Sequence, residues 1–325
     1  MRIAFVGKGG SGKTTLSALF SQFIKKNHSP VLVIDADINM HLGSLLGFEN
    51  TVLSNIHISH PESVKYIKTY LRGNNERIKQ LSHFRKTTPP TKDSNFIVIH
   101  DQTDTVLAQY TVGSPDFRLM IVGTYDTDDI GASCYHNNLA ILENVLSHIV
   151  DNKGTVVTDM VAGVDAFANS LHAQFDMLVL TVEPTNRGVE VFNQYKRLAD
   201  DAGVSDSLYV VGNKIRNSSD VDFIKRNIPN ERLIGFFPES DYLRKKDQEG
   251  GSLDVELLEK ENKKLLSQIS DQLSNMSPDY HSRLQKLYNL HRRYVAQDFI
   301  RERFGDLADH IDESFDFQEF IKNHA

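Results

Sequence analysis

The stretch GKGGSGKTT, residues 7–15, follows the apolar run of residues 2–6 and is the strongest constraint on the fold. Its G-x-x-x-x-G-K-T spacing is that of a phosphate-binding P-loop. Glycines let such a loop turn tightly and bring its N–H groups against phosphate oxygens, and a helix beginning near Thr14 adds a partial positive charge. A buried strand, this loop and a helix in that order predict an α/β protein with a nucleotide beyond the strand's carboxyl end.

Short β-branched runs alternate with helical patterns through about the first 240 residues. Near-continuous apolar strands that alternate with helices are typical of a mostly parallel sheet covered by helices on both faces, so the sequence predicts a P-loop NTPase fold. The expected strands are residues 2–6, 31–35, 118–122, 155–159, 177–182, 208–212 and 232–237. The expected helices are residues 14–27, 138–150, 165–174, 188–200 and 220–227.

Two segments interrupt this alternation and set the expected domain organisation. Residues 49–115 are too long for a connection, and we interpret them as an inserted subdomain with a helix at 62–85 and strands at 96–100 and 106–111. Residues 1–250 would then form the ATPase domain and residues 251–325 a helical extension. Two apolar stripes at helical spacing predict packing for that extension, one of Leu258, Leu265, Ile269 and Leu273, the other of Leu284, Leu287, Tyr288, Tyr294, Val295 and Phe299.

The loop itself supplies most of the candidate nucleotide ligands. In a P-loop the lysine at the position of Lys13 reaches the β- and γ-phosphates, and the hydroxyl at the position of Thr14 ligates Mg²⁺. The residues expected to bind ATP here are Gly9, Gly10, Ser11, Gly12, Lys13, Thr14 and Thr15. Lys8 has no place in this scheme, because one lysine is enough for a P-loop.

Carboxylates follow two of the predicted strands. Asp35 and Asp37 end the run VLVIDADIN, and Asp159 ends TVVTDMVAG in a Walker B arrangement. We expect Asp37 to orient the attacking water and to lie in the Mg²⁺ site with Thr14 and Asp159, while Asp35 supports the loop. Taken singly, each aspartate would serve equally well as a helix cap or a turn residue, and the P-loop favours the functional reading.

Two further residues are candidates for contact with the base. Asn213 ends the run VVGNKI, and an amide can offer both a donor and an acceptor to an adenine edge. Pro238 lies in GFFPES after the last predicted strand, where it would wall the base. Neither signal is specific alone.

Charge and composition narrow the class of protein. The net charge is −7, yet residues 61–92 carry eight basic residues against Glu62 and Glu76. This basic segment consists of Lys65, Lys68, Arg72, Arg77, Lys79, Arg85, Lys86 and Lys92. It either meets a polyanion such as nucleic acid or is an ordinary solvated face. A single cysteine, the absence of an apolar run of about 20 residues and the lack of a signal peptide favour a cytoplasmic protein.

The motifs K-G-G-S-G-K-T-T, D-A-D-x-N, D-M-x-A-G and V-x-N-K resemble those of the deviant-Walker-A ATPases, the group of MinD, ParA, the nitrogenase iron protein and CooC. The likeness covers about the first 240 residues. In that group the lysine at the position of Lys8 crosses a dimer interface to the partner's nucleotide. The resemblance therefore implies a Mg²⁺-dependent ATPase that dimerises on ATP, with Lys8 acting catalytically in trans beside Lys13 and Asp37.

Within the group the chain is most similar to the CooC ATPases of nickel insertion into carbon monoxide dehydrogenase. The segment VGTYDTDDIGASCYHNN precedes a helix as their C-x-C segment does, with Cys134 and His136 at the same spacing. The resemblance implies a Ni²⁺ or Zn²⁺ site at the dimer axis and a role in metal-centre maturation. One sulfur is replaced by an imidazole, so nickel specificity is not carried over. The alternative is a buried Cys134 and a His136 at a helix end.

Other roles in the group stay open. A ParA- or MinD-like positioning or partner-docking ATPase is the alternative function, and the basic segment of residues 61–92 is its main support. Membrane binding is not expected, because the stretch DESFDFQEFIKNHA has one lysine among several acids. A kinase or synthetase is disfavoured by Lys8, since such an enzyme needs an open acceptor site. The client protein is not identified by the sequence.

Overall fold

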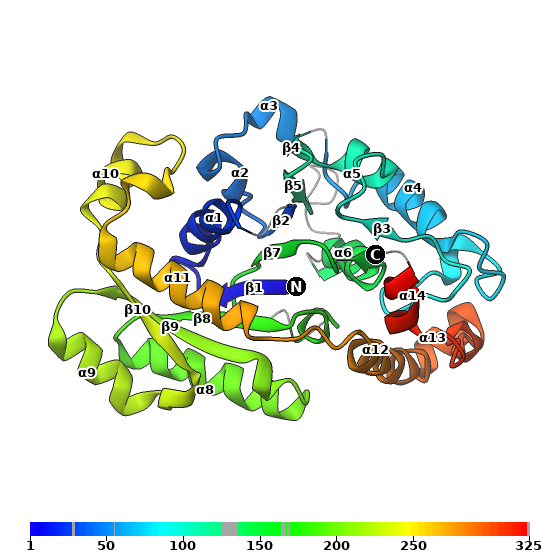
Figure 1. Cartoon of the computed structure of the whole chain (residues 1–325). Coiled ribbons are helices and arrows are strands. Elements are labelled where there is room, and N and C mark those ends of the chain that lie inside the picture. Colours follow the sequence, from blue (N-terminus) through cyan, green and yellow to red (C-terminus); the bar gives the residue numbers. More distant parts are fainter. Residues whose placement is uncertain (28–29, 55, 125–135, 164–166, 168–169, 324–325) are drawn as a thin grey trace.

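The computed structural model describes residues 1–27, 30–54, 56–124, 136–163, 167 and 170–323. Within these residues eight strands form one sheet in the order β10-β9-β8-β1-β7-β2-β5-β4, shown in Figure 1. Each neighbouring pair is parallel except β4 with β5. The strands are β1 (Arg2–Gly7), β2 (Val31–Ala36), β4 (Val112–Ser114), β5 (Phe117–Ile121), β7 (Thr155–Met160), β8 (Met177–Val182), β9 (Leu208–Ile215) and β10 (Leu233–Pro238).

Helices cover both faces of this sheet. The side chains of β1 point alternately to the two faces, so apolar residues on each face pack into a hydrophobic core under the helices of that face. Ile3 and Phe5 belong to the core beneath α1 and α11, whereas Ala4 and Val6 belong to the core beneath α6, α8 and α9. The mostly parallel sheet with helices on both faces confirms the predicted fold class. These helices and their smaller neighbours are α1 (Lys13–Ile24), α2 (Leu42–Leu45), α3 (Asn50–Leu53), α6 (His136–Ser147), α8 (Asn186–Asp201), α9 (Ser218–Asn227), α10 (Asp241–Glu249) and α11 (Lys260–Ser274).

The segment of residues 49–115 differs in detail from the prediction. Its main helix, α4 (Pro61–Arg72), ends well before residue 85, because Gly73 takes a positive φ of 54° with no room for a Cβ beside Asp93 and Asn95. The predicted strand at 106–111 is wrong. A helix, α5 (Thr105–Tyr110), occupies it, since the Asp104 side chain accepts the N–H of Leu107 at 2.9 Å and caps the helix.

The predicted strand at 96–100 is present only as β3 (Ile97–Val98), which pairs in parallel with β6 (Ile149–Val150). Beside this small sheet lie the C-terminal helices α12 (Tyr280–Val295) and α14 (Phe317–Asn323), and α13 (Asp298–Phe304) follows α12 in the chain (Figure 1). Phe96 stacks on Phe317 with ring centroids 5.4 Å apart. Residues far apart in the sequence therefore build one shared cluster between the insertion and the extension.

The extension follows its predicted stripes with one exception. The first stripe is buried, and so is most of the second, but Phe299 is 62% exposed on α13. The extension is also not helical throughout, since turns separate α11 from α12 and α13 from α14. Of the helix predicted at 165–174, residues 171–174 form a 3-10 turn, and residues 165–166 and 168–169 lie outside the described residues.

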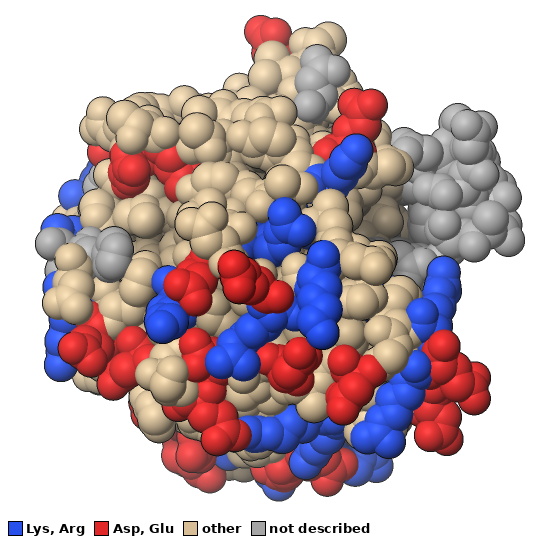
Figure 2. Space-filling view, turned by 90° about the vertical axis from the view of Figure 1, so that its right-hand side faces the viewer, with Lys and Arg blue, Asp and Glu red and all other residues tan. Residues whose placement is uncertain are grey.

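Several members of the basic segment bind within the molecule, among them Lys86, whose Nζ lies over the Tyr294 ring at 5.7 Å. Arg85 lies over the Phe304 ring at 4.1 Å, Arg77 donates to the Asp309 carbonyl at 3.0 Å, and Lys68 donates to the Phe84 carbonyl at 2.9 Å. The first two hold the C-terminal helices against the insertion. Figure 2, which views this side of the molecule, shows Lys and Arg interleaved with Asp and Glu rather than gathered in one positive surface. This arrangement weakens the case for a nucleic-acid surface.

None of the described helices is both long and apolar enough to cross a membrane.

Candidate nucleotide site

The P-loop connects the carboxyl end of β1 to the first turn of α1. Gly7 and Gly12 both have positive φ values, 152° and 91°. A Cβ on Gly7 would lie 2.6 Å from the Thr181 hydroxyl, and a Cβ on Gly12 would collide with the Asn213 amide. Glycine is therefore required at both positions, because neighbouring strands approach the loop too closely for a side chain.

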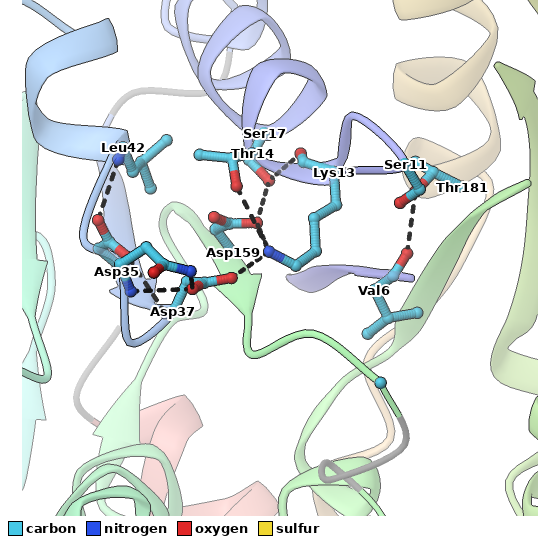
Figure 3. A network of polar contacts seen from close by, with 12 residues as sticks. Val6, Ser11, Lys13, Thr14, Ser17, Asp35, Asp37, Leu42, Asp159 and Thr181 are labelled. Carbon is cyan, nitrogen blue, oxygen red and sulfur yellow. Dashed lines mark hydrogen bonds and ion pairs between the residues drawn. The ribbon is translucent and has the colours of Figure 1, made fainter. Parts of the chain in front are cut away.

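Side chains from those strands hold the loop. The hydroxyls of Ser11 and Thr181 are 2.6 Å apart, and Thr181 also donates to the Val6 carbonyl at 3.3 Å. Asn213 Nδ2 donates to the Ser11 carbonyl at 2.6 Å. Figure 3 shows Ser11 and Thr181 on one side of the site, away from the carboxylates.

Lys13 lies at the centre of the carboxylates (Figure 3). Its Nζ forms an ion pair with Asp37 and lies 3.9 Å from Asp159 Oδ1 and 3.4 Å from the Thr14 hydroxyl. The hydroxyl of Ser17, one turn along α1, shares its one hydrogen between the Lys13 carbonyl at 2.8 Å and Asp159 Oδ1 at 3.3 Å. The first turn of α1 is thereby joined to the ends of β2 and β7.

Asp35 and Asp159 occupy adjacent positions on the parallel strands β2 and β7. Asp35 is fully buried and accepts the backbone N–H groups of Asp37 and Leu42, both at 3.1 Å, so it fixes the turn after β2. Asp37 in turn accepts the backbone and side-chain N–H groups of Asn39 at 3.0 and 2.9 Å. The turn is held by carboxylates that all lie at one edge of the sheet.

The three carboxylates have different proton affinities. Burial raises the pKa of Asp159 to about 6, with Lys13 opposing the shift. Burial and the nearby Asp159 carboxylate raise the pKa of Asp35 well above its ordinary value. Burial alone would raise the pKa of Asp37 too, but the hydrogen bond and charge of Lys13 hold it below its ordinary value. Lys13 therefore compensates only part of the negative charge that these three carboxylates can carry.

Two cavities adjoin the loop. One of about 440 Å³ is lined by Gly10, Lys13, Thr14 and Asp37 among others, and suits phosphates. The second, of about 420 Å³, has walls that include Phe237, Pro238 and Leu243, and suits a base. Both cavities share Gly12, Thr15, Lys214 and Asp247. Together they offer room for one nucleotide laid across the loop.

The structure brings together most of the residues that the sequence proposes. Gly9, Gly10, Gly12, Lys13, Thr14, Thr15 and Asp37 line the first cavity, and Asn213 and Pro238 line the second. The amide of Asn213 is already engaged, since its Oδ1 accepts the N–H of Lys214 at 2.8 Å and its Nδ2 binds the loop. Asn213 thus supports the P-loop as well as facing the cavity.

Other proposed residues lie apart from the cavities or outside the described chain. Lys8 is exposed, and its side chain makes no hydrogen bond or ion pair with any part of the chain that the structure describes. Cys134 lies outside the described residues. His136 is the first residue of α6, and nothing is described of its side chain.

Sequence reasoning missed several residues of the site, and three of them make informative contacts. Ser17 bridges α1 and Asp159, Thr181 holds the loop, and Lys214 lines both cavities. A signal existed for two of them: Thr181 lies near the end of a predicted strand, and Lys214 belongs to the V-x-N-K motif. Ser17 is one of several polar residues of α1 and carries no such signal.

The oxygen ligands at this edge fit Mg²⁺. Asp159 Oδ2 is buried without a hydrogen-bond partner among the described residues, and Asp37 and the Thr14 hydroxyl lie close to the same amine. The described residues contain no group of three or more His, Cys, Asp or Glu side chains able to hold a metal. Mg²⁺ needs none, because it is commonly bound through one or two carboxylates, water and substrate phosphates.

Comparison with known proteins gives one matching family model and several similar proteins. The family model described as the CobQ/CobB/MinD/ParA nucleotide binding domain matches residues 3–253. The carbon monoxide dehydrogenase accessory protein CooC of Rhodospirillum rubrum is 28% identical over 251 residues, 77% of this chain and 88% of that protein. An uncharacterized ATP-binding protein of Methanocaldococcus jannaschii is 26% identical over 242 residues, 73% of this chain and 85% of its own length.

Solved structures share the fold at low sequence identity. A plasmid partition protein of Borrelia burgdorferi bound to AMPPNP aligns with a TM-score of 0.54 and 15% identity over 85% of this chain and 99% of its own. The cell division ATPase MinD of Pyrococcus furiosus aligns with a TM-score of 0.54 and 17% identity, again over 85% and 99%.

Proposed function

The chain belongs to the CobQ/CobB/MinD/ParA nucleotide-binding family of P-loop ATPases, and on that premise we propose that it is a cytoplasmic, Mg²⁺-dependent ATPase that acts as an ATP-gated dimeric switch. We assign residues 1–250 to the P-loop ATPase domain, with an inserted subdomain at about 49–115, and residues 251–325 to a helical C-terminal extension. The observation that carries the proposal is Lys13, held by Asp37 and near Asp159 at the floor of a cavity lined by P-loop backbone.

The residues suggest a division of labour in ATP hydrolysis. Mg²⁺ held by Thr14, Asp37 and Asp159 would neutralise charge on the phosphates. Lys13 binds the β- and γ-phosphates through its ammonium group. Asp37 is ionised at neutral pH, since Lys13 lowers its pKa, and it accepts a hydrogen bond from the water that attacks the γ-phosphorus. The bond to the bridging oxygen breaks, and ADP and inorganic phosphate leave.

Lys8 supports the dimeric part of the proposal. Its ammonium group is exposed at the mouth of the loop and makes no ion pair with the described part of the chain. An amine in that place is free to reach a second subunit's nucleotide and to compensate the charge that develops there. The switch then consists of dimer formation with ATP and dimer dissociation after hydrolysis.

The test measures hydrolysis, nucleotide affinity and mass in solution with ATP. An Asp37→Ala variant should bind ATP, hydrolyse it slowly and run as a dimer. Lys8→Ala should bind ATP yet stay monomeric and inactive, whereas Lys13→Ala should lose binding. Lys25→Ala, at the other end of α1, is the matched control and should behave as wild type. A Lys8→Ala protein that dimerises and hydrolyses normally would contradict the switch.

We further propose that the switch serves metal-centre maturation, on the support of the similarity to a protein named as a carbon monoxide dehydrogenase accessory protein. Cys134 and His136 from two subunits would supply four ligands for Ni²⁺ or Zn²⁺ across the dimer axis. Metal titration of the ATP-loaded dimer should show one site per dimer. Equal binding by a Cys134→Ser variant would rule that site out.

A further inference from the structure

Lys214 connects the P-loop to a neighbouring strand. Its Nζ donates to the Gly10 carbonyl at 2.7 Å and forms an ion pair with Glu183 Oε1 at 2.5 Å. Glu183 directly follows β8, and Lys214 itself lies in β9. Because the sheet order is β9-β8-β1, this one side chain reaches from β9 past the end of β8 to the loop after β1.

The backbone at Lys214 is unusual for a lysine. Its φ of 58° lies in the left-handed region, and among the described residues only Met40 is a second non-glycine with positive φ. That conformation is unfavourable for any residue with a Cβ and is more easily adopted by glycine or asparagine. Outliers of this kind persist where the surroundings enforce them, often beside a functional site. Lys214 lines both cavities of the nucleotide site.

Asn213 and Lys214 act on consecutive carbonyls of the loop. Asn213 Nδ2 holds the Ser11 carbonyl and Lys214 Nζ holds the Gly10 carbonyl, at 2.6 and 2.7 Å. A loop that binds an anion through its N–H groups must turn its carbonyl oxygens away from that anion. Donors outside the loop that bind these carbonyls keep the N–H groups pointing inward before any phosphate arrives.

We propose that Lys214 is a positioning residue for nucleotide binding, which holds the P-loop in its phosphate-binding conformation with Glu183 as the anchor for its amine. The inference rests on the proposed nucleotide function. The pair is partly exposed, with Lys214 at 46% and Glu183 at 30%, so solvent screens its charge and the effect comes mainly from the hydrogen bond to Gly10. Since the loop binds the phosphates common to ADP and ATP, both nucleotides depend on Lys214.

Equilibrium binding of ADP and of a non-hydrolysable ATP analogue, each with Mg²⁺, tests this role. Lys214→Met should raise the Kd of both nucleotides by about tenfold, the value of one charged hydrogen bond. Lys214→Arg should restore most of the affinity, and Glu183→Gln should cause a smaller loss. Lys196→Met is the matched control, because Lys196 is 45% exposed and pairs with Asp200 on the neighbouring α8. In steady-state hydrolysis Lys214→Met should raise KM and leave kcat nearly unchanged.

Lys214→Gly separates the amine from the turn. It relieves the left-handed backbone but removes the donor, so weak binding like that of Lys214→Met would support the proposal. Normal binding by either variant would overturn it and leave Lys214 as a turn residue. Failure of the wild-type protein to bind ADP or the analogue would instead overturn the proposed function, and the positioning role with it.

Discussion

The central sheet buries charged groups at the carboxyl ends of its strands, here called the carboxyl edge, and at their amino ends, here called the amino edge. The two edges balance positive and negative charge in opposite ways. At the carboxyl edge the carboxylates of Asp37 and Asp159 flank the ammonium group of Lys13, and Asp35 lies next to Asp159 on the neighbouring strand. At the amino edge two carboxylates meet three cations within the described chain. Asp151 binds Arg2 at 3.1 Å, the Met1 ammonium group at 3.1 Å and Arg283 at 3.6 Å, and Asp176 binds Arg283 at 2.6 Å.

Asp151 and Asp159 show what this difference means. Both are fully buried; Asp151 precedes β7 in the chain, and Asp159 lies near the carboxyl end of β7. Burial alone would raise the pKa of Asp151, but Arg2, the Met1 ammonium group and Arg283 hold it well below its ordinary value. Burial raises the pKa of Asp159 to about 6, because Lys13 compensates it only in part. The amino edge neutralises its own acids, whereas the carboxyl edge needs a cation from outside.

The largest expected effect is on the carboxyl edge. Replacing Lys13 in a Lys13→Met variant removes the ammonium group next to Asp37 and Asp159, so the phosphates would meet these carboxylates with no ion-pair partner from Lys13 between them. Nucleotide affinity should fall about a thousandfold, equal to about 4 kcal/mol. Isothermal titration with ADP and Mg²⁺ measures it, beside Lys25→Met as the control. If the affinity falls less than tenfold, the site does not depend on this amine.

The difference between the two edges also explains which of their charged residues could be predicted from the sequence. Asp35, Asp37 and Asp159 follow apolar runs, and the rule that strand ends share an edge brings them together. The amino-edge cluster has no such rule, since Arg2, Asp151, Asp176 and Arg283 are spread over most of the chain. Only Arg2, a charge inside an apolar strand, was a local signal. The strand predicted at 106–111 failed because a cap at Asp104 outweighed the apparent alternation.

We expect the amino edge to contribute to the stability of the fold and not to nucleotide binding, and a substitution of Arg283 tests this. An Arg283→Met variant leaves the partly buried Asp176 without its ion-pair partner and the fully buried Asp151 with one cation fewer. Breaking a buried pair in this way should lower the free energy of unfolding by about 3 kcal/mol. Urea denaturation measures the loss, and Arg293→Met, an exposed change on the same helix, should cost little. Nucleotide affinity should not change, and a matching loss of affinity would break the proposed separation of the two edges.

The pH dependence of folding stability should also distinguish the two edges. The pKa of Asp159 is raised to about 6 in the folded protein, whereas a carboxyl in the unfolded chain ionises at about pH 4. Between about pH 4 and 6, Asp159 is therefore ionised in the unfolded chain while it is still protonated in the folded protein. The nucleotide-free protein should lose up to about 3 kcal/mol over that range, and Asp159→Asn should remove this loss. The pKa of Asp151 is instead lowered by folding, so its contribution to the stability of the folded protein is lost as pH falls below about 4.

Unfolding midpoints of the nucleotide-free protein from pH 4 to 7 measure this effect. Asp116→Asn, in an exposed turn, is the control and should run parallel to wild type. Addition of ADP with Mg²⁺ at pH 7 should stabilise wild type. A curve for Asp159→Asn that also runs parallel to wild type would mean that the carboxyl edge holds no uncompensated charge.

The smallest effect is expected for Asp176→Asn at the amino edge. Asp176 accepts the Arg2 backbone N–H at 2.8 Å and Arg283 at 2.6 Å, and its side chain is 12% exposed, so water reaches it in part. The amide keeps one acceptor and loses the charge, which should cost about 1 kcal/mol. Because Asp176 and Arg283 are in contact, the double variant Asp176→Asn/Arg283→Met should cost less than the sum of the single changes. Strict additivity in urea denaturation would show that the cluster is a set of independent contacts, and the amino edge would then not be a balanced network.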